Sequence, residues 1–511
     1  MDNLSTKACS TFPAPGHSES RPAFPAPVYR DTVLAPIFAD AKKYFLAPLI
    51  EIEYAHTVML ARQGIMPEVE AAMCIRALDG LDLEEIRTAK HDGSFEDLFF
   101  YVEKKLAAVC GEEIAGKMHT ARSRNDIDLT MYRMLLRERL GKSFGALLGL
   151  RARLAELAWQ HREALIPAYT HNQPAQPTTL GHYLMAYIEV LERDAERIRE
   201  TYVRVNRCPL GACAITTTGF PIDRHYTERL LGFEGLQMNS YGAIAAVDYV
   251  TESCSVLATA MVSLGRFAQE MLLWSTAEFS YLRLSDAYVQ ISSIMPQKRN
   301  PVPLEHVRIL ASRALTQSQA ILGCVHNTPF ADMNDAEDEL QPLVYTAFED
   351  AERSTRLLTG TLEEAEFNLE RMAKAADGNF LPVTELADTL VRTTGMSFHA
   401  AHGIVSRAVR ELNGKYDAEE MTEIVVRELA AGGYVVTREQ ISEALRAKNF
   451  VAVRKIPGGP APEALEPEIR RAREQLSSDE GWLRRTEEKW ATAREQMRQE
   501  CDSLLRRTDE Q

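Results

Sequence analysis

The segment DIDLTMYRMLLRERLGKSFGALLGLRARLAELAWQHREALI, residues 126–166, decides the fold. Its apolar residues recur at steps of three and four, among them Leu129, Leu136, Leu140 and Leu147. Such spacing, sustained over about forty residues, is typical of one amphipathic helix. At about 1.5 Å per residue this helix would be roughly 60 Å long.

Four more segments have the same spacing, and almost no stretch alternates as a strand should. They are residues 180–205, 243–279, 303–326 and 336–376. Helices of this length bury their apolar stripes only against one another. The sequence therefore predicts an all-α fold around a central bundle of five long helices, with ordered loops rich in Pro, Gly, Thr, Ser and Asn between them.

The chain has 511 residues, of which 45% are hydrophobic and 26% charged, an ordinary globular composition. This length favours more than one core. Five prolines between Ser10 and Pro27 predict an extended arm. We expect a flexible proline-rich leader, an N-terminal helical domain, a central helix-bundle domain and a C-terminal helical domain with a charged helical tail, at residues 1–30, 31–124, 125–376 and 377–511.

Charge and cysteine usage limit the partners and the compartment. The net charge of −15 favours neither nucleic acid nor an anionic membrane as a partner. Apolar runs such as residues 271–274 are far shorter than a membrane span. The eight cysteines lack paired spacing, and no secretory signal opens the chain. We expect reduced thiols and a cytoplasmic location.

The charged tail carries a narrow apolar seam. Leu483, Trp490, Met497 and Leu504 recur every seven residues, a spacing suited to packing against one helix. The tail would either dock onto its own subunit or associate with the tails of other copies.

Three polar segments stand out against the helical background. Residues 119–126, HTARSRND, open the longest helix and could be a simple helix cap with structural arginines. Residues 169–179, YTHNQPAQPTT, hold one histidine among many donors. Residues 292–301, SSIMPQKRNP, join two hydroxyls to a lysine and an amide. That last set could bind and process a carboxylate, or form a polar turn between two helices.

Together the three segments resemble the signature regions of the argininosuccinate lyase branch of the fumarase–aspartase superfamily. The third matches the pattern S-S-x-M-P-x-K-x-N, and T-A-R-S-R-N-D in the first separates this branch from adenylosuccinate lyases. Further similarity runs through residues 175–182, 209–211, 221–224 and 458–462. The resemblance covers about residues 35 to 470.

The resemblance implies a three-domain fumarase/aspartase-like fold with a homotetrameric helical core. Each composite active site would collect segments from three subunits. Such enzymes eliminate an amine from a succinyl unit and form fumarate, without a cofactor or metal. Here Ser292 would be the base that removes the Cβ proton. Lys298, Asn300 and Thr170 would stabilise the aci-carboxylate dianion, since several fixed donors must surround that carboxylate.

The same resemblance implies roles at the other end of the substrate. His171 would carry the proton to the departing amine, with Glu305 as its orienting partner. Ser123, Arg124 and Asn125 would hold the second carboxylate, and the planar fork of an arginine suits a bidentate contact.

The sequence departs from the family where the leaving group should be recognised. Asp332, Glu337 and Leu340 stand where the family has Tyr, Gln and Lys, and the family's D-A-V-x-D-R-D is altered at residues 242–248. The loss of a lysine and the gain of two carboxylates should favour a cationic amine. We therefore expect a carbon–nitrogen lyase for an N-substituted L-aspartate, with Asp332 and Glu337 binding the amine. The alternatives are an authentic argininosuccinate lyase, producing arginine and fumarate, and a catalytically silent, crystallin-like structural protein.

Overall fold

The structure is a computed structural model that describes residues 24–510. Most of the predicted leader, residues 1–30, therefore lies outside the described residues. The first described elements are α1 (Pro27–Tyr29) and a π-helical turn (Arg30–Leu34), which lead directly into the N-terminal helices.

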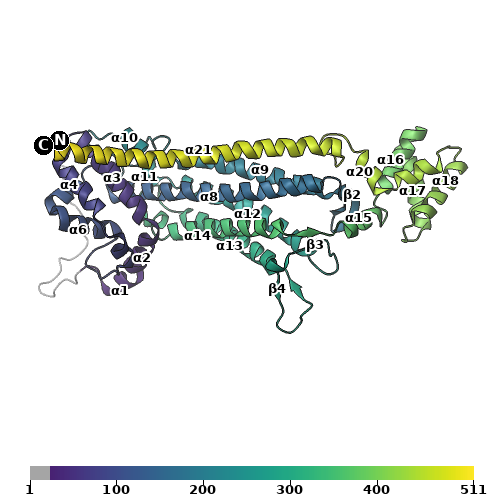
Figure 1. Ribbon diagram of the computed structural model, residues 1–511, viewed down its shortest axis with the longest axis horizontal. Helices are drawn as coiled ribbons and strands as arrows, with labels where there is room; N and C mark the ends of the chain where they lie inside the picture. Colours follow the sequence, from purple (N-terminus) through teal and green to yellow (C-terminus); the bar gives the residue numbers. More distant parts are fainter. Residues whose placement is uncertain (1–23, 511) are drawn as a thin grey trace, which may run out of the picture.

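Five long helices lie side by side and form the body of the molecule, which confirms the predicted helical fold (Figure 1). Along the first of them the apolar stripe is buried, with Tyr132, Phe144 and Leu150 fully inaccessible to solvent. The five are α8 (Arg124–Gln160), α9 (Leu180–Val205), α12 (Asp248–Trp274), α13 (Val302–Val325) and α14 (Gln341–Glu363).

The segments between the long helices differ from the prediction, because they contain short strands where helix or loop was expected. After α8 the chain forms an antiparallel hairpin of β1 (Leu165–Thr170) and β2 (Gln173–Thr179). Its prolines exclude helix continuation. The helix predicted over residues 336–376 is interrupted, because β6 (Glu366–Phe367) pairs with β3 (Leu282–Arg283) before α15 (Leu369–Asp377) begins. A third ribbon joins β4 (Gln290–Ile291) to β5 (Arg299–Asn300).

The N-terminal helices cover the end of the bundle at which α8 begins (Figure 1). They share one continuous hydrophobic core with the bundle. They are α2 (Ala35–Tyr44), α3 (Leu46–Arg62), α4 (Glu68–Asp79), α5 (Leu83–Thr88), α6 (Leu98–Cys110) and α7 (Glu112–Lys117), with α10 (Arg224–Leu230) and α11 (Ser240–Ala245) nearby.

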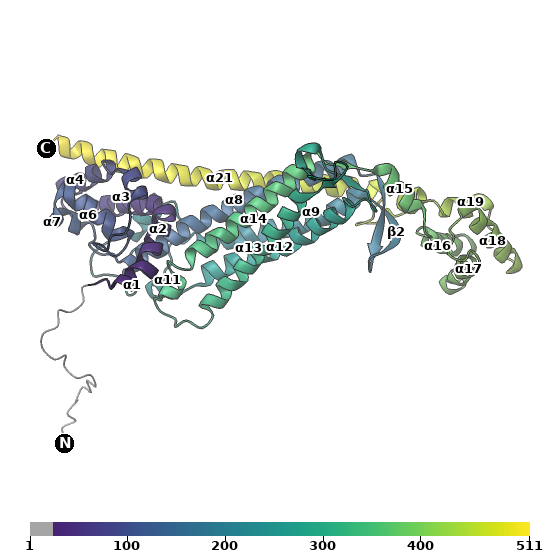
Figure 2. The same cartoon turned by 90° about the horizontal axis from the view of Figure 1, so that it is seen from below.

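A second core forms a separate lobe at the opposite end of the molecule (Figure 2). Leu390 and Met421 are fully buried in it. The lobe contains α16 (Val383–Thr394), α17 (Phe398–Glu411), α18 (Ala418–Ala431) and α19 (Arg438–Ala444), and α20 (Ala447–Ala452) links it to the bundle.

The charged tail is one helix, α21 (Pro462–Asp509), which runs back along the bundle to the N-terminal helices (Figures 1 and 2). Trp490, Met497 and Leu504 are buried in the bundle's core, so the seam docks onto its own chain. The predicted C-terminal domain, residues 377–511, therefore combines α21 with the lobe of α16 to α19, although α21 packs in the core of the bundle.

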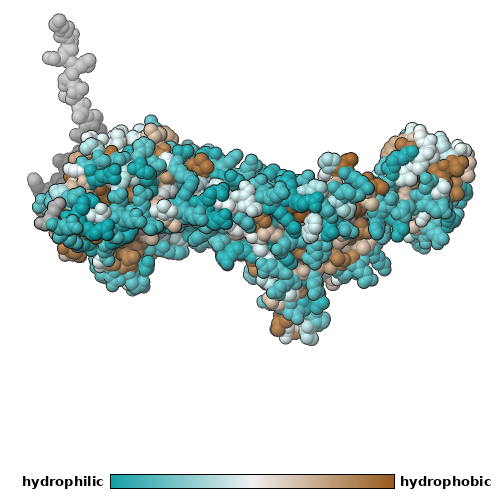
Figure 3. Space-filling model, turned by 45° about the horizontal axis from the view of Figure 1, so that its top comes forward, coloured by the Kyte–Doolittle hydropathy of each residue, from teal (hydrophilic) through white to brown (hydrophobic). Residues whose placement is uncertain are grey.

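Of the described helices, α12 alone has the length and apolarity that crossing a membrane would require. It packs between α9 and α13, as a core helix of a bundle does. The face of the molecule in Figure 3 is largely hydrophilic. Apolar side chains gather at the tip of the part that projects from the bundle in this view. Ile291 and Ile294, in the β4–β5 hairpin, are each 82% exposed.

Candidate active site

The start of α8 is fixed by a buried carboxylate. Ser123 caps the helix, and its backbone N–H donates to Asp126 Oδ1 at 2.8 Å. The other oxygen of Asp126 accepts from the backbone amides of Gly211 (2.7 Å) and Cys213 (2.9 Å). Gly211 has φ +87°, and a Cβ there would lie 2.6 Å from the Arg224 side chain. Two of the segments that carry the family resemblance therefore meet at Asp126.

The predicted substrate-holding residues lie beside this cap and already have partners. Arg124 Nη1 lies 2.6 Å from Asp97 Oδ2 and 3.2 Å from Glu96 Oε1. The Asn125 amide nitrogen donates to Asp332 Oδ2 at 2.7 Å and to the carbonyl of Ala214 at 3.1 Å. The structure thus brings Asp332 directly against the predicted substrate segment.

Four carboxyl groups, Asp128, Asp332, Glu337 and Asp338, form what we call the acidic cluster. Burial, and then the neighbouring Asp332, raise the pKa of Glu337 to about 8. Burial and Asp338 hold the pKa of Asp128 well above its usual range. Tyr132 donates its hydroxyl to Asp338 at 2.9 Å. Glu337 therefore favours its protonated form at neutral pH.

Sequence reasoning found Asp332 and Glu337 but missed Asp128 and Asp338. A usable signal was the spacing of Asp128, four residues after Arg124 and hence on the same face of α8. Leu340, by contrast, is only 4% exposed and packs in the hydrophobic core. It does not belong to the acidic cluster.

Both segments that depart from the family line one small cleft. Asp332 and Glu337 reach it from the loop before α14. Ile244, Val247 and Tyr249 reach it from the altered segment at residues 242–248 and the start of α12. The substitutions that separate this chain from the family pattern are thus neighbours in space.

Thr170 and His171 lie at the tip of the β1–β2 hairpin, near the other end of the bundle. His171 and Asn172 form a two-residue turn with φ of 51° and 59°, the geometry of a tight hairpin turn. Both Thr170 and His171 are exposed.

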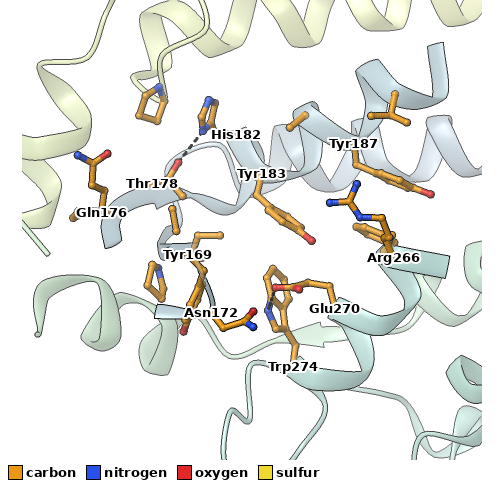
Figure 4. A pocket seen from close by; sticks show the side chains of 18 of the residues that line it. Tyr169, Asn172, Gln176, Thr178, His182, Tyr183, Tyr187, Arg266, Glu270 and Trp274 are labelled. Atoms are coloured by element: carbon orange, nitrogen blue, oxygen red, sulfur yellow. Dashed lines mark hydrogen bonds between the residues drawn. The ribbon is translucent and has the colours of Figure 1, made fainter. Parts of the chain in front are cut away.

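A cavity of about 740 Å³ lies between this hairpin, α9 and α12, and His171 contributes to its lining. Tyr183, Glu270 and Trp274 point into it (Figure 4). Trp274 Nε1 donates to Glu270 at 3.1 Å, and burial raises the pKa of Glu270. Thr178 Oγ1 and His182 Nδ1 are 2.8 Å apart at the base of the hairpin.

The segment that carries Ser292, Lys298 and Asn300 is the β4–β5 hairpin, which projects from the bundle (Figure 1). Ser292 Oγ accepts from the backbone N–H of Met295 at 3.1 Å. Asn300 donates to the carbonyl of Gln290 at 3.0 Å. Lys298 is exposed, as is Glu305 in the first turn of α13.

One chain does not bring all the predicted catalytic groups together. The 37 residues of α8 span about 55 Å at about 1.5 Å per residue. Ser123 precedes this helix, whereas Thr170 and His171 lie beyond its far end, and the Ser292 hairpin projects sideways (Figures 1 and 2). Within the chain, Asn125 meets Asp332, but neither Thr170 nor Ser292 reaches that end.

Comparison with known proteins finds similarity along nearly the whole chain. Residues 56–316 match a family described as Lyase, and residues 380–452 match one described as Argininosuccinate lyase C-terminal. Argininosuccinate lyase 2 of Agrobacterium fabrum is 41% identical over 91% of this chain and 93% of its own. Argininosuccinate lyase of Methanoculleus marisnigri is 40% identical over 88% and 91%.

Solved structures show the same fold. A variant of EDDS lyase with bound fumarate has a TM-score of 0.84 at 33% identity, covering 95% of this chain and 97% of that one. A class II fumarase from Schistosoma mansoni has a TM-score of 0.65 at 16% identity, covering 81% and 91%. At that identity, the fumarase supports the fold alone.

Proposed function

Because the chain belongs to the argininosuccinate lyase branch of the fumarase–aspartase superfamily and is a fumarate-releasing carbon–nitrogen lyase, we propose that its substrate is an N-substituted L-aspartate whose leaving group is a cationic amine without an obligatory carboxylate.

The observation that carries this proposal is the 2.7 Å contact between Asn125 and Asp332. The acidic cluster therefore lies beside Asn125, to which we assign, with Ser123 and Arg124, the substrate's second carboxylate. Each ionised carboxyl in that cluster attracts an ammonium or guanidinium and repels an anionic tail. Leu340 supplies no cation to offset them, because its side chain is uncharged and is buried in the core. The leaving-group end of the site therefore selects for positive charge.

The fumarate-forming half follows the chemistry of the family. Ser292, as an alkoxide, takes the Cβ proton, and the electron pair of the C–H bond moves into the adjacent carboxylate. Lys298, Asn300 and Thr170 donate to the resulting dianion. When the dianion collapses, the C=C bond of fumarate forms and the C–N bond breaks. The nitrogen receives a proton from His171, which Glu305 orients. The similarity to a fumarate-bound EDDS lyase variant supports this half.

We further propose that the site is composite and that the enzyme is a homotetramer. The separation of Ser123, His171 and Ser292 within one chain supports this, since catalysis needs them within hydrogen-bonding reach of one substrate. Mixing His171→Asn and Ser292→Ala chains by co-expression tests it. Activity above that of either variant alone is expected, because some mixed sites then receive both intact residues. Activity no higher than either parent would mean that one chain supplies both.

A second candidate is authentic argininosuccinate cleavage, favoured by the two relatives of that name at 41% and 40% identity. Amine addition to fumarate separates the candidates, using two matched pairs that differ by one carboxylate: agmatine against arginine, and putrescine against ornithine. The proposal expects the carboxylate-free partner of each pair to have the higher kcat/KM by about tenfold or more. A preference for arginine over agmatine would establish the second candidate instead.

A further inference from the structure

The turn that leads into the substrate-binding segment has a backbone that needs support. Ala121, two residues before Ser123, has φ of 64°. A residue with a side chain rarely adopts this left-handed conformation, and it persists only where the surroundings hold it. Cys213 Sγ donates to the carbonyl of Ala121 at 3.2 Å, which supplies one contact.

The other contacts come from α3, in the N-terminal helices. Arg122 Nη2 donates to Glu53 Oε2 at 2.6 Å, and the two side chains are only 2% and 3% exposed. His56, three residues after Glu53 and on the same side of α3, donates from Nε2 to the carbonyl of Thr120 at 2.9 Å. Burial lowers the pKa of His56 well below its usual range, so the ring is neutral. Glu53 and His56 thus hold the chain on both sides of Ala121.

A buried ion pair is an inefficient way to stabilise a fold. Removing two charges from water costs about as much as their attraction returns, and well-packed apolar side chains often do better. The Nε and Nη1 atoms of Arg122 are moreover buried without a hydrogen-bond partner. What the pair does provide is a fixed position for Arg122, and Ser123, Arg124 and Asn125 follow it directly.

We infer that Glu53 is a positioning residue: through its buried ion pair with Arg122 it sets the geometry with which Ser123, Arg124 and Asn125 bind the substrate's carboxylate. This rests on the proposed function, which assigns carboxylate binding to those three residues. Glu53 itself does not touch the substrate.

The experiment compares Glu53→Gln with Asp479→Asn, each of which removes the acid from a buried ion pair. The Arg151–Asp479 pair is the control, because it has the same 2.6 Å distance and side chains 1% and 3% exposed, but ties α8 to α21. Asp479 also pairs with Arg199 of α9 at 2.9 Å. Both variants should lower Tm. Only Glu53→Gln should raise KM for fumarate in the addition reaction, by about tenfold, with kcat changed less than about threefold. Equal KM values in the two variants would overturn the inference.

Two further variants keep the result interpretable. If Glu53→Gln does not fold, Arg122→Lys retains the charge but loses the planar fork, and it should still raise KM for fumarate. An Arg122→Lys enzyme with unchanged KM would overturn the inference as well. Asn125→Ala tests the premise separately. A raised KM in Asn125→Ala beside an unchanged KM in Glu53→Gln rejects only the positioning role, whereas an unchanged KM in Asn125→Ala rejects the proposed binding of the carboxylate by Asn125, which is the premise of that role.

Discussion

Replacing Glu337 with Gln should stabilise the protein, and increasingly so as the pH rises. The carboxyl has a pKa of about 8 in place of 4.5, so between these values the folded chain keeps a proton that the unfolded chain has lost. The free energy of unfolding then falls as the pH rises through this window. The full interval of 3.5 corresponds to about 5 kcal/mol, at about 1.4 kcal/mol per pKa unit. Because Glu337 is only partly buried and solvent screens part of this effect, we expect about 2–3 kcal/mol from the substitution near pH 9.

The assay is the Tm of both proteins from pH 5 to pH 9 at one protein concentration, since assembly makes Tm depend on concentration. The variant should match the unaltered protein near pH 5 and exceed it progressively toward pH 9. Glu339→Gln is the control, because Glu339 is an exposed carboxylate in the same loop, and it should give no such trend. A Tm difference for Glu337→Gln that stays constant across this range would refute the assignment of Glu337 to a buried, charge-repelling cluster.

Three further predictions concern the reaction. Ser292→Ala should reduce turnover at least about a hundredfold without changing Tm, because it removes the base from an exposed hairpin; a loss below about tenfold would direct attention to Ser293. Binding of a cationic amine near pH 8 should release up to about half a proton, because Glu337 is about half protonated there and a cation favours its ionised form; calorimetry in buffers of different ionisation enthalpy measures this, and Glu337→Gln should reduce it. Saturating fumarate should slow proteolysis within residues 285–303, as closure over the substrate would, and equal cleavage rates would count against closure.

The long helices could be predicted because their apolar stripes extend over many turns. The stripe through Leu129, Leu136 and Leu140 is repeated often enough to identify α8 unambiguously. The β3–β6 ribbon could not, since two residues carry no periodicity and the pairing joins Leu282 to Phe367, far along the chain. The spacing of apolar residues therefore predicted the long helices, but it could not predict strands that pair with a segment far away in the sequence.

The site residues divide in the same way. Motifs identified the segments of Ser123, His171 and Ser292, because their residue types lie close together in sequence. The acidic cluster was only half found, because Asp128 joins Asp332 and Glu337 through the packing of α8 against the loop before α14. The burial of Leu340 could not be predicted either. An ungapped comparison of residues 330–342 shows which family residue Leu340 replaces, but not whether its side chain faces the core or the site.

The acidic cluster and the groups assigned to fumarate formation differ in how the chain brings their residues together. The acidic cluster is complete within one chain, where Asn125 meets Asp332 and both altered segments line one cleft. Ser292 and Lys298 lie on the β4–β5 hairpin and Thr170 and His171 on the β1–β2 hairpin, and the proposed composite site would bring the two hairpins together from different copies of the chain. Under the proposed function, substitutions at residues 242–248 and 330–342 would therefore change the leaving group and leave the hairpins assigned to fumarate formation untouched. A branch of enzymes built in this way keeps one elimination chemistry and diverges in the amine that it releases.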